Sequence, residues 1–216
     1  MSLWVKVCAN TSMEDAMLAV NAGADAVGFV FAPSPRQVSV EQVAAITPNL
    51  PSSIEKIGVF AGSTPQEIAR AVERCGLTGA QLHFEGGQDL VAALRDRFGT
   101  TLRILNVLHY APDASEKAAF LAANKQIDAI LVDSRTPAAI GGTGIRFDWD
   151  DAASLFNNAG VKMIAAGGLN PANVAEAIEK LQPWGVDVAS GVEAAPGRKD
   201  PEKVRSFVEN ARRARS

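Results

Sequence analysis

Cysteine and histidine are scarce in this sequence. Its 216 residues include two cysteines, Cys8 and Cys75, and two histidines, His83 and His109. With so few cysteines and no recognisable export signal, we expect no structural disulfide and a reducing, cytoplasmic location. The histidines stand alone, without the spacing of metal ligands, so no metal site is expected.

Other absences argue against several classes of partner. The net charge is only −3, with both signs scattered, whereas duplex binding normally needs a basic face, so nucleic acid is not expected. No apolar stretch reaches membrane-spanning length, so no membrane partner is expected either. Neither GxGxxG nor GxxxxGK(S/T) occurs, so we expect no cofactor. One basic cluster, Arg212, Arg213 and Arg215, continues a helical pattern and is interpreted as a solvated helix end.

Short apolar runs alternate with helical segments along the whole chain. The predicted strands begin at Trp4, Ala26, Glu55, Gly79, Leu102, Ala129, Lys162 and Gly185. This alternation is typical of a mostly parallel sheet, and eight such units fit a compact barrel. We predict one (β/α)8 barrel over residues 1–216. An open doubly wound sheet remains the alternative, because the strand count alone does not prove closure.

Capping residues mark several helix ends. Ser12 is expected to cap one helix, and Asn170 and Asp200 precede prolines at the expected first position of two others. Gly23 and Gly76 stand where helix ends favour a left-handed residue.

Polar side chains collect where the predicted strands end. They are Cys8, Arg36, His83, Asp133 and Asp187. In a closed barrel the active site lies at the carboxyl ends of the strands, so these distant residues are expected around one mouth.

Cys8 has two interpretations, a small core residue or a general base. Strand alternation puts Trp4, Lys6 and Cys8 on one face. If that face points into the barrel, the Lys6 cation lies below the thiol and favours the thiolate. The alternative for Lys6 is a buried ion pair with Asp187, whereas Cys75 is expected in the core.

Asp133 ends an apolar strand as its only charge. A carboxyl buried there tends to keep its proton, as a general acid must, but a structural carboxylate that caps a backbone amide fits equally well.

Glycine-rich loops follow the last three predicted strands. Gly167 and Gly168 follow the seventh and Ser190 and Gly191 the eighth, which is the recurrent phosphate site of such barrels. Ordinary turns are the alternative. The segment from Ile140, with Gly142 and Gly144, is interpreted as a mobile loop over the mouth, or as a plain connector. We list these two glycines among the substrate-binding candidates.

Taken together, the segments KVCANTSMEDA, GADAVGFVFAPSPRQVS, QLH, VDS, GGTGIRFDW, AAGGLNPANVAEAI and GVDVASGVEAAPGRKDPEKVRSF resemble the motif series of the phosphoribosylanthranilate isomerases, in the same order and over nearly the whole chain. The resemblance implies a TIM barrel that performs a cofactor-free Amadori rearrangement of a phosphosugar in tryptophan biosynthesis. It implies Asp133 as the general acid and Cys8 as the general base.

The resemblance also implies that Arg36 pairs with the anthranilate carboxylate and that His83 and Asp187 line the sugar pocket. A monomer or a homodimer is expected. The family generally has glycine after the cysteine and after the QLH histidine, where this chain has Ala9 and Phe84.

The alternatives are a non-catalytic phosphosugar-binding barrel and another barrel enzyme. Indole-3-glycerol-phosphate synthase would need a lysine acid at a strand end, and a pentose-phosphate epimerase would need metal ligands.

Overall fold

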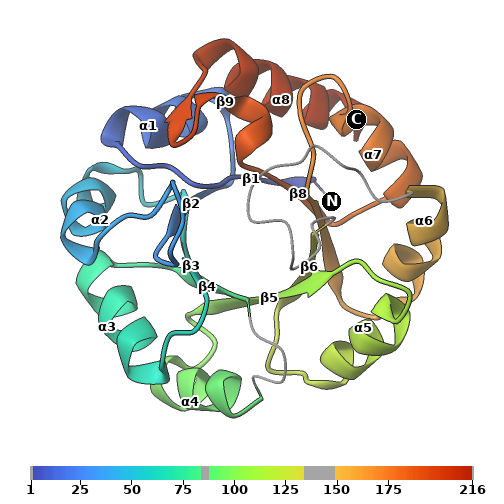
Figure 1. The fold of residues 1–216 in the computed structure, drawn as a ribbon, viewed down its shortest axis with the longest axis horizontal. Helices are drawn as coiled ribbons and strands as arrows, with labels where there is room; N and C mark the ends of the chain where they lie inside the picture. The colour runs from blue at the N-terminus through green and yellow to red at the C-terminus, as the bar shows by residue number, and fades with distance from the viewer. Residues whose placement is uncertain (1, 84–87, 134–148, 216) are drawn as a thin grey trace.

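The chain folds into a closed barrel of eight parallel strands. The computed structural model describes residues 2–83, 88–133 and 149–215. Each strand pairs with the next one along the chain, and β8 pairs in parallel with β1, which closes the ring. Figure 1 looks down this ring and shows the helices outside it. Closure confirms the predicted (β/α)8 barrel and excludes the open sheet.

The barrel strands lie within or close to the apolar runs that predict them. Their bounds are β1 Trp4–Val7, β2 Ala26–Val30, β3 Glu55–Phe60, β4 Gly79–Leu82, β5 Arg103–His109, β6 Ala129–Asp133, β7 Lys162–Ala166 and β8 Gly185–Val188. The helices are α1 Met13–Ala22, α2 Val40–Ile46, η1 Thr47–Asn49, α3 Pro65–Cys75, α4 Gln88–Phe98, α5 Ala114–Ala123, α6 Trp149–Asn158, α7 Val174–Leu181 and α8 Pro201–Ala214. In the described part of the chain, no helix has the length and apolar character needed to cross a membrane.

The strands divide their side chains between two apolar cores. Trp4, Leu105 and Leu131 belong to the smaller core, inside the barrel, and the larger core lies between the strands and the helices. Because successive side chains of a strand point to opposite faces, Lys6 and Cys8 share the inner face with Trp4. The barrel interior therefore changes from apolar to polar toward the carboxyl ends of its strands.

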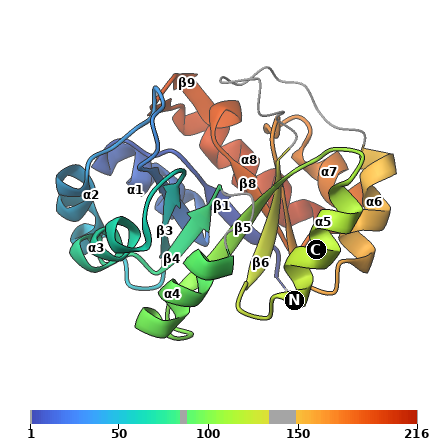
Figure 2. The same ribbon diagram turned by 60° about the horizontal axis from the view of Figure 1, so that its bottom comes forward.

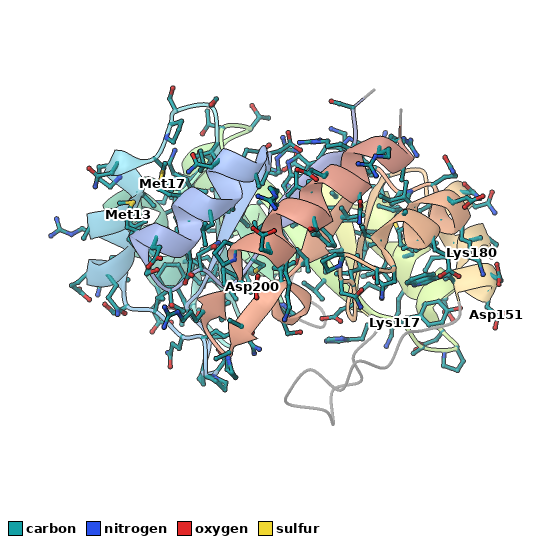
Figure 3. The ribbon with its side chains drawn as sticks, turned by 90° about the horizontal axis from the view of Figure 1, so that it is seen from above. Met13, Met17, Lys117, Asp151, Lys180 and Asp200 are labelled. Atoms are coloured by element: carbon teal, nitrogen blue, oxygen red, sulfur yellow. The ribbon has the colours of Figure 1, made fainter. Side chains whose placement is uncertain are left out.

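Most of the predicted helix ends are confirmed. The side chains of Ser12 and Asp200 each accept a hydrogen bond from the amide three residues further on, at 3.1 and 3.0 Å. Figure 3 labels Asp200 at the start of α8. Gly23 and Gly76 end their helices with φ of 87° and 57°, the left-handed conformation that glycine adopts easily.

The predicted start of α7 is wrong. The helix begins at Val174, not beside Asn170. The Asn170 amide donates to Asn173 Oδ1 at 2.8 Å, and Asn170 Oδ1 accepts from the Ala172 amide at 2.9 Å. These asparagine side chains close a tight turn that competes with the helix.

A short hairpin that the sequence reading did not predict separates β8 from α8. It consists of β9 Glu193–Ala195 and β10 Arg198–Lys199, and it follows the 3-10 turn η2 Ser190–Val192. Figure 2 shows β9 at one end of the barrel and the amino terminus at the other.

Arg212 joins the last helix to the start of the barrel. Its guanidinium donates to the carbonyl oxygens of Leu3 and Gly23, the second at 2.7 Å, and to Asp25 Oδ2 at 2.8 Å. The same Asp25 oxygen accepts from the Val5 amide at 2.7 Å. The interpretation of the terminal basic cluster as a solvated helix end is therefore wrong for Arg212.

We expect Arg212→Ala to lower the free energy of unfolding by about 1–2 kcal/mol. Charged hydrogen bonds contribute about 1.5–3 kcal/mol when buried, and this side chain is 34% exposed, so solvent screening reduces the effect. Urea denaturation measures it. Arg213→Ala is the matched control, since Arg213 is exposed on the same turn and its loss should change stability by less than about 0.5 kcal/mol. Equal effects of the two variants would contradict the proposed link.

Candidate active site

A cavity of about 230 Å³ opens at the carboxyl ends of the strands. It brings together most of the side chains and glycine turns selected from the sequence. The predicted residues that line it are Cys8, Arg36, His83, Asp133, Gly167, Gly168, Asp187, Ser190 and Gly191. Gly142, Gly144 and Phe84 lie outside the described residues.

Cys8 follows β1 and is buried at the base of this cavity. Its amide donates to the Val188 carbonyl at 2.7 Å, which fixes the backbone against β8. A Cβ atom on Gly28 would lie 2.7 Å from Cys8 Sγ, so glycine in β2 leaves the room that the thiol occupies. The sequence reading missed Gly28, although a lone glycine inside a predicted strand signals such a close approach. Cys75 packs in the outer core, as expected.

The Lys6 ammonium lies below the thiol with no exposed surface. It donates to Asp187 Oδ1 and to Gln81 Oε1, both at 2.9 Å. The alternative interpretation of Lys6, a buried ion pair with Asp187, is therefore confirmed. Gln81 was not selected from the sequence, yet it stands two residues before His83 on the same strand face and lies 3.3 Å from it through the two Nε2 atoms.

The surroundings of Cys8 favour the neutral thiol. Burial raises the pKa of Cys8, and repulsion from Asp187 adds to this, whereas attraction to Lys6 and Lys199 only partly opposes it. Burial lowers the pKa of Lys6, but attraction to Asp187 and Cys8 outweighs it, so the pKa is raised and Lys6 stays protonated. The expected attraction between Lys6 and the thiol is present and favours the thiolate, but burial and Asp187 outweigh it, so the net pKa of Cys8 is raised.

Asp133 ends β6 on the same inner face. It is 2% exposed and lies in register between His109 of β5 and Ala166 of β7. The rings of His83 and His109 are 6.0 Å apart and tilted by 45°. Within the described ranges, no cluster of three or more potential metal-binding side chains is found.

Arg36 lies in the loop after β2 and is clamped by a carboxylate. Its Nε is 2.8 Å from Glu193 Oε1, and its Nη2 is 2.7 Å from Glu193 Oε2. This planar two-point pairing fixes the guanidinium plane at the edge of the cavity. Sequence reasoning selected Arg36 but not Glu193, which is 157 residues away.

The two glycine turns meet on the β7–β8 side of the cavity. Gly167 and Gly168 have φ of 78° and 66°, so both need glycine's conformational freedom. A Cβ on Gly191 would lie 1.9 Å from the Leu169 carbonyl oxygen, which shows how closely the second turn packs on the first. Consecutive amides in such turns form a concave donor site that suits an anion.

Ala9 follows the thiol with a left-handed backbone, at φ 63°. Its neighbour Asn10 holds the turn through its side-chain amide, which donates to the carbonyls of Val7 at 2.8 Å and Gly28 at 3.1 Å. A left-handed non-glycine residue costs about 1–2 kcal/mol. The backbone angles at this position therefore favour the glycine that the sequence lacks.

This arrangement combines a thiol, a carboxyl group, a guanidinium and an anion-binding turn in one cavity. The first two can move protons and the last two can hold negative groups. The chemistry it supports is proton transfer on an anionic small molecule.

Comparisons with known proteins agree with this chemistry. The profile of the N-(5'phosphoribosyl)anthranilate (PRA) isomerase family matches residues 5–210. The N-(5'-phosphoribosyl)anthranilate isomerase of Pelobacter propionicus is 43% identical over 213 residues, which cover 98% of this chain and 97% of the relative.

Solved structures show the same likeness. The phosphoribosyl anthranilate isomerase of Thermotoga maritima has a TM-score of 0.87 and 36% identity, covering 97% of this chain and 98% of its own. An isomerase in complex with reduced 1-(o-carboxyphenylamino)-1-deoxyribulose 5-phosphate has a TM-score of 0.84 and 33% identity, with the same two coverages.

We expect Ala9→Gly to raise the free energy of unfolding by about 0.5–1 kcal/mol. Relief of the left-handed strain outweighs the greater freedom of glycine in the unfolded chain, which is about 0.4–1 kcal/mol. Chemical denaturation measures the change. Ala16→Gly, in the right-handed backbone of α1, is the control, and it should lower the free energy of unfolding by about 1 kcal/mol or more. An Ala9→Gly variant less stable than the parent would contradict the strain argument.

Proposed function

The chain belongs to the N-(5'-phosphoribosyl)anthranilate isomerase family, and we propose that it works with Asp133 as its general acid and Cys8 as its general base. The protein is an isomerase of tryptophan biosynthesis, which converts N-(5-phosphoribosyl)anthranilate into 1-(2-carboxyphenylamino)-1-deoxyribulose 5-phosphate. The observation that carries the assignment of roles is that a buried carboxyl group, at the end of β6, and a buried thiol, just after β1, both line one cavity.

The rearrangement needs one proton given and one removed to reach an enolamine, and one more of each to reach the ketone. An acid protonates the furanose ring oxygen, so that the C1–O bond breaks and an imine forms. A base then removes the proton from sugar carbon 2, which gives an enolamine. Protonation at carbon 1 and loss of the enol proton complete the ketone. Reactant and product are isomers, so acid and base catalysis suffices for the balance of atoms and electrons.

The phosphate is proposed to bind the amides of Gly167, Gly168, Ser190 and Gly191. The positive φ angles of the first pair and the close packing of Gly191 on Leu169 support this assignment. Backbone amides carry no charge, so the turn can hold a dianion without a side chain that competes for the protons of the reaction.

Arg36 is proposed to bind the anthranilate carboxylate at the other end of the substrate. A guanidinium suits this task because its planar fork matches two carboxylate oxygens. The Glu193 carboxylate occupies the edge formed by Nε and Nη2. The substrate carboxylate is proposed to pair with the guanidinium in the orientation that Glu193 gives it.

The sugar is proposed to lie between these two ends, beside Asp187 and His83. Asp187 is held by Lys6 at 2.9 Å, which leaves its carboxylate anchored while it lines the cavity. Gly142 and Gly144 are proposed to help hold the substrate from their loop.

Residues 1–216 are proposed to act as one catalytic domain in the cytoplasm. The two free thiols, Cys8 and Cys75, support a reducing compartment. A monomer or a homodimer is proposed. The site residues described above come from one chain, and the isomerase of Thermotoga maritima is described as dimeric, with monomers obtained from it.

We expect Cys8→Ser and Asp133→Asn each to lower kcat by at least about 100-fold, which is typical when a general base or acid is lost. A serine hydroxyl hardly ionises near neutral pH, and an asparagine amide cannot give up a proton to the ring oxygen. Fluorescence decay of phosphoribosylanthranilate measures turnover. Cys75→Ser, in the outer core, is the matched thiol control.

Both variants should still bind the reduced product analogue, because shape and charge at the substrate ends are kept. Near-normal turnover by Cys8→Ser would make the thiol a packing residue. Normal turnover by both variants would overturn the assigned roles. No turnover by the parent would overturn the activity itself.

The pH dependence provides an independent test of the base. Burial raises the pKa of Cys8 above that of an ordinary cysteine, so only a small fraction is thiolate at neutral pH. Turnover by the parent also requires protonated Asp133, so the test uses Asp133→Asn, in which that group no longer titrates. Since the thiolate is the active form, the residual kcat/KM of this variant should rise with pH, by about tenfold per unit from about pH 6 to about pH 8. The residual rate of Cys8→Ser should lack this rise. An Asp133→Asn profile that falls over this range would contradict a cysteine base.

A further inference from the structure

A buried carboxylate lies between two cations beside the active-site cavity. Glu193 accepts from Arg36 at 2.7 and 2.8 Å, from Lys199 Nζ at 3.4 Å and from the Gly197 amide at 3.3 Å. Its side chain is only 4% exposed, and that of Lys199 is fully buried. Glu193 and Lys199 are direct partners in the β9–β10 ladder, so the hairpin fixes their spacing.

Lys199 contacts the backbone at the start of the proposed phosphate-binding turn, Ser190–Gly191. Its ammonium donates to the Ala189 carbonyl at 3.2 Å, and Ala189 directly precedes the turn η2. The same carbonyl accepts from the Val192 amide at 3.4 Å, which closes the turn. The Lys199 amide donates to Asp15 Oδ1 at 2.9 Å, and this bond anchors the hairpin to α1. The position of the ammonium therefore determines how the carbonyl, and with it the turn, is held.

Two fully or nearly fully buried charges, with the partly buried Arg36 beside them, contribute little net stability to a fold. Desolvation of each ion costs several kcal/mol, and apolar residues of similar volume often stabilise a buried site as well or better. The three side chains instead join the loop after β2 to the hairpin and to the turn after β8. Two of the groups they hold, Arg36 and Ala189, line the cavity.

We propose that Glu193 and Lys199 are positioning residues, one for each anion-binding end of the cavity. Glu193 orients Arg36 toward the substrate carboxylate, and Lys199 orients the Ser190–Gly191 turn toward the phosphate. This inference rests on the proposed function of Arg36 and of that turn. Neither positioning residue touches the reacting atoms, so substrate binding depends on them more than proton transfer does.

The test compares two ligands on three variants. The reduced product analogue carries both a carboxylate and a phosphate, whereas ribulose 5-phosphate carries only the phosphate. Arg36→Met and Glu193→Gln should each lower the affinity for the analogue by about tenfold to a hundredfold. They should change the affinity for ribulose 5-phosphate by less than about twofold. Lys199→Met should lower the affinity for both ligands by about tenfold or more.

Steady-state kinetics separate positioning from chemistry and from folding. Glu193→Gln should raise KM by more than it lowers kcat, because Arg36 acts on ground and transition states alike. Glu73→Gln is the matched control, since it also removes an arginine-paired carboxylate, but at the surface, where both side chains of the pair are more than half exposed. This control should leave the affinity for both ligands unchanged. If Glu193→Gln fails to fold, Glu193→Asp keeps the charge, retracts it from Arg36 and should give the same ligand pattern.

The outcomes distinguish failure of this inference from failure of the proposed function on which it rests. If Arg36→Met weakens the analogue and Glu193→Gln does not, the positioning role of Glu193 is overturned and the role of Arg36 stands. If Arg36→Met has no effect, the proposed carboxylate site fails, and the Glu193 half of the inference fails with it. If Lys199→Met lowers only the melting temperature and leaves ribulose 5-phosphate binding unchanged, Lys199 is structural and its half is overturned.

Discussion

A fully buried ammonium at the centre of a closed barrel constrains the rest of this active site. Lys6 cannot reach water, so its charge must be balanced by neighbours, and Asp187 and Gln81 provide that balance from β8 and β4. Asp187 and Gln81 line the cavity, and Lys6 joins them from inside the barrel. Their positions place Cys8 above Lys6, hold Asp187 at the cavity wall and put Gln81 beside His83. The polar floor of the site is therefore one connected set of contacts.

This floor has a consequence for the chemistry. A cation close to a thiol favours its thiolate, but the carboxylate that balances the cation opposes this effect, and burial opposes it further. The thiol is consequently neutral at rest. Once deprotonated, a thiolate in such a site is a stronger base than an ordinary one, because the pKa of its conjugate acid is higher. The same surroundings that make the active form scarce therefore make it effective.

The proposed substrate ends are served by a second polar set, around Glu193. It is built mainly from the hairpin after β8, which lies beside α1 rather than in the barrel wall. This barrel thus carries separate parts for proton transfer and for holding anions. The first is set by strand register and the second by loops that meet at the mouth.

The sequence by itself determined the alternation of strands and helices, the caps at Ser12 and Asp200, and the candidates at the strand ends. These depend on local preference and on a period of two residues, both of which can be read along a chain. Only the tertiary structure decided that Glu193 clamps Arg36, that Arg212 joins α8 to the first strand and that the pKa of Cys8 rises. Each of these arises between residues far apart in the sequence, or from burial. Their signs follow from distances and desolvation, which no local pattern contains.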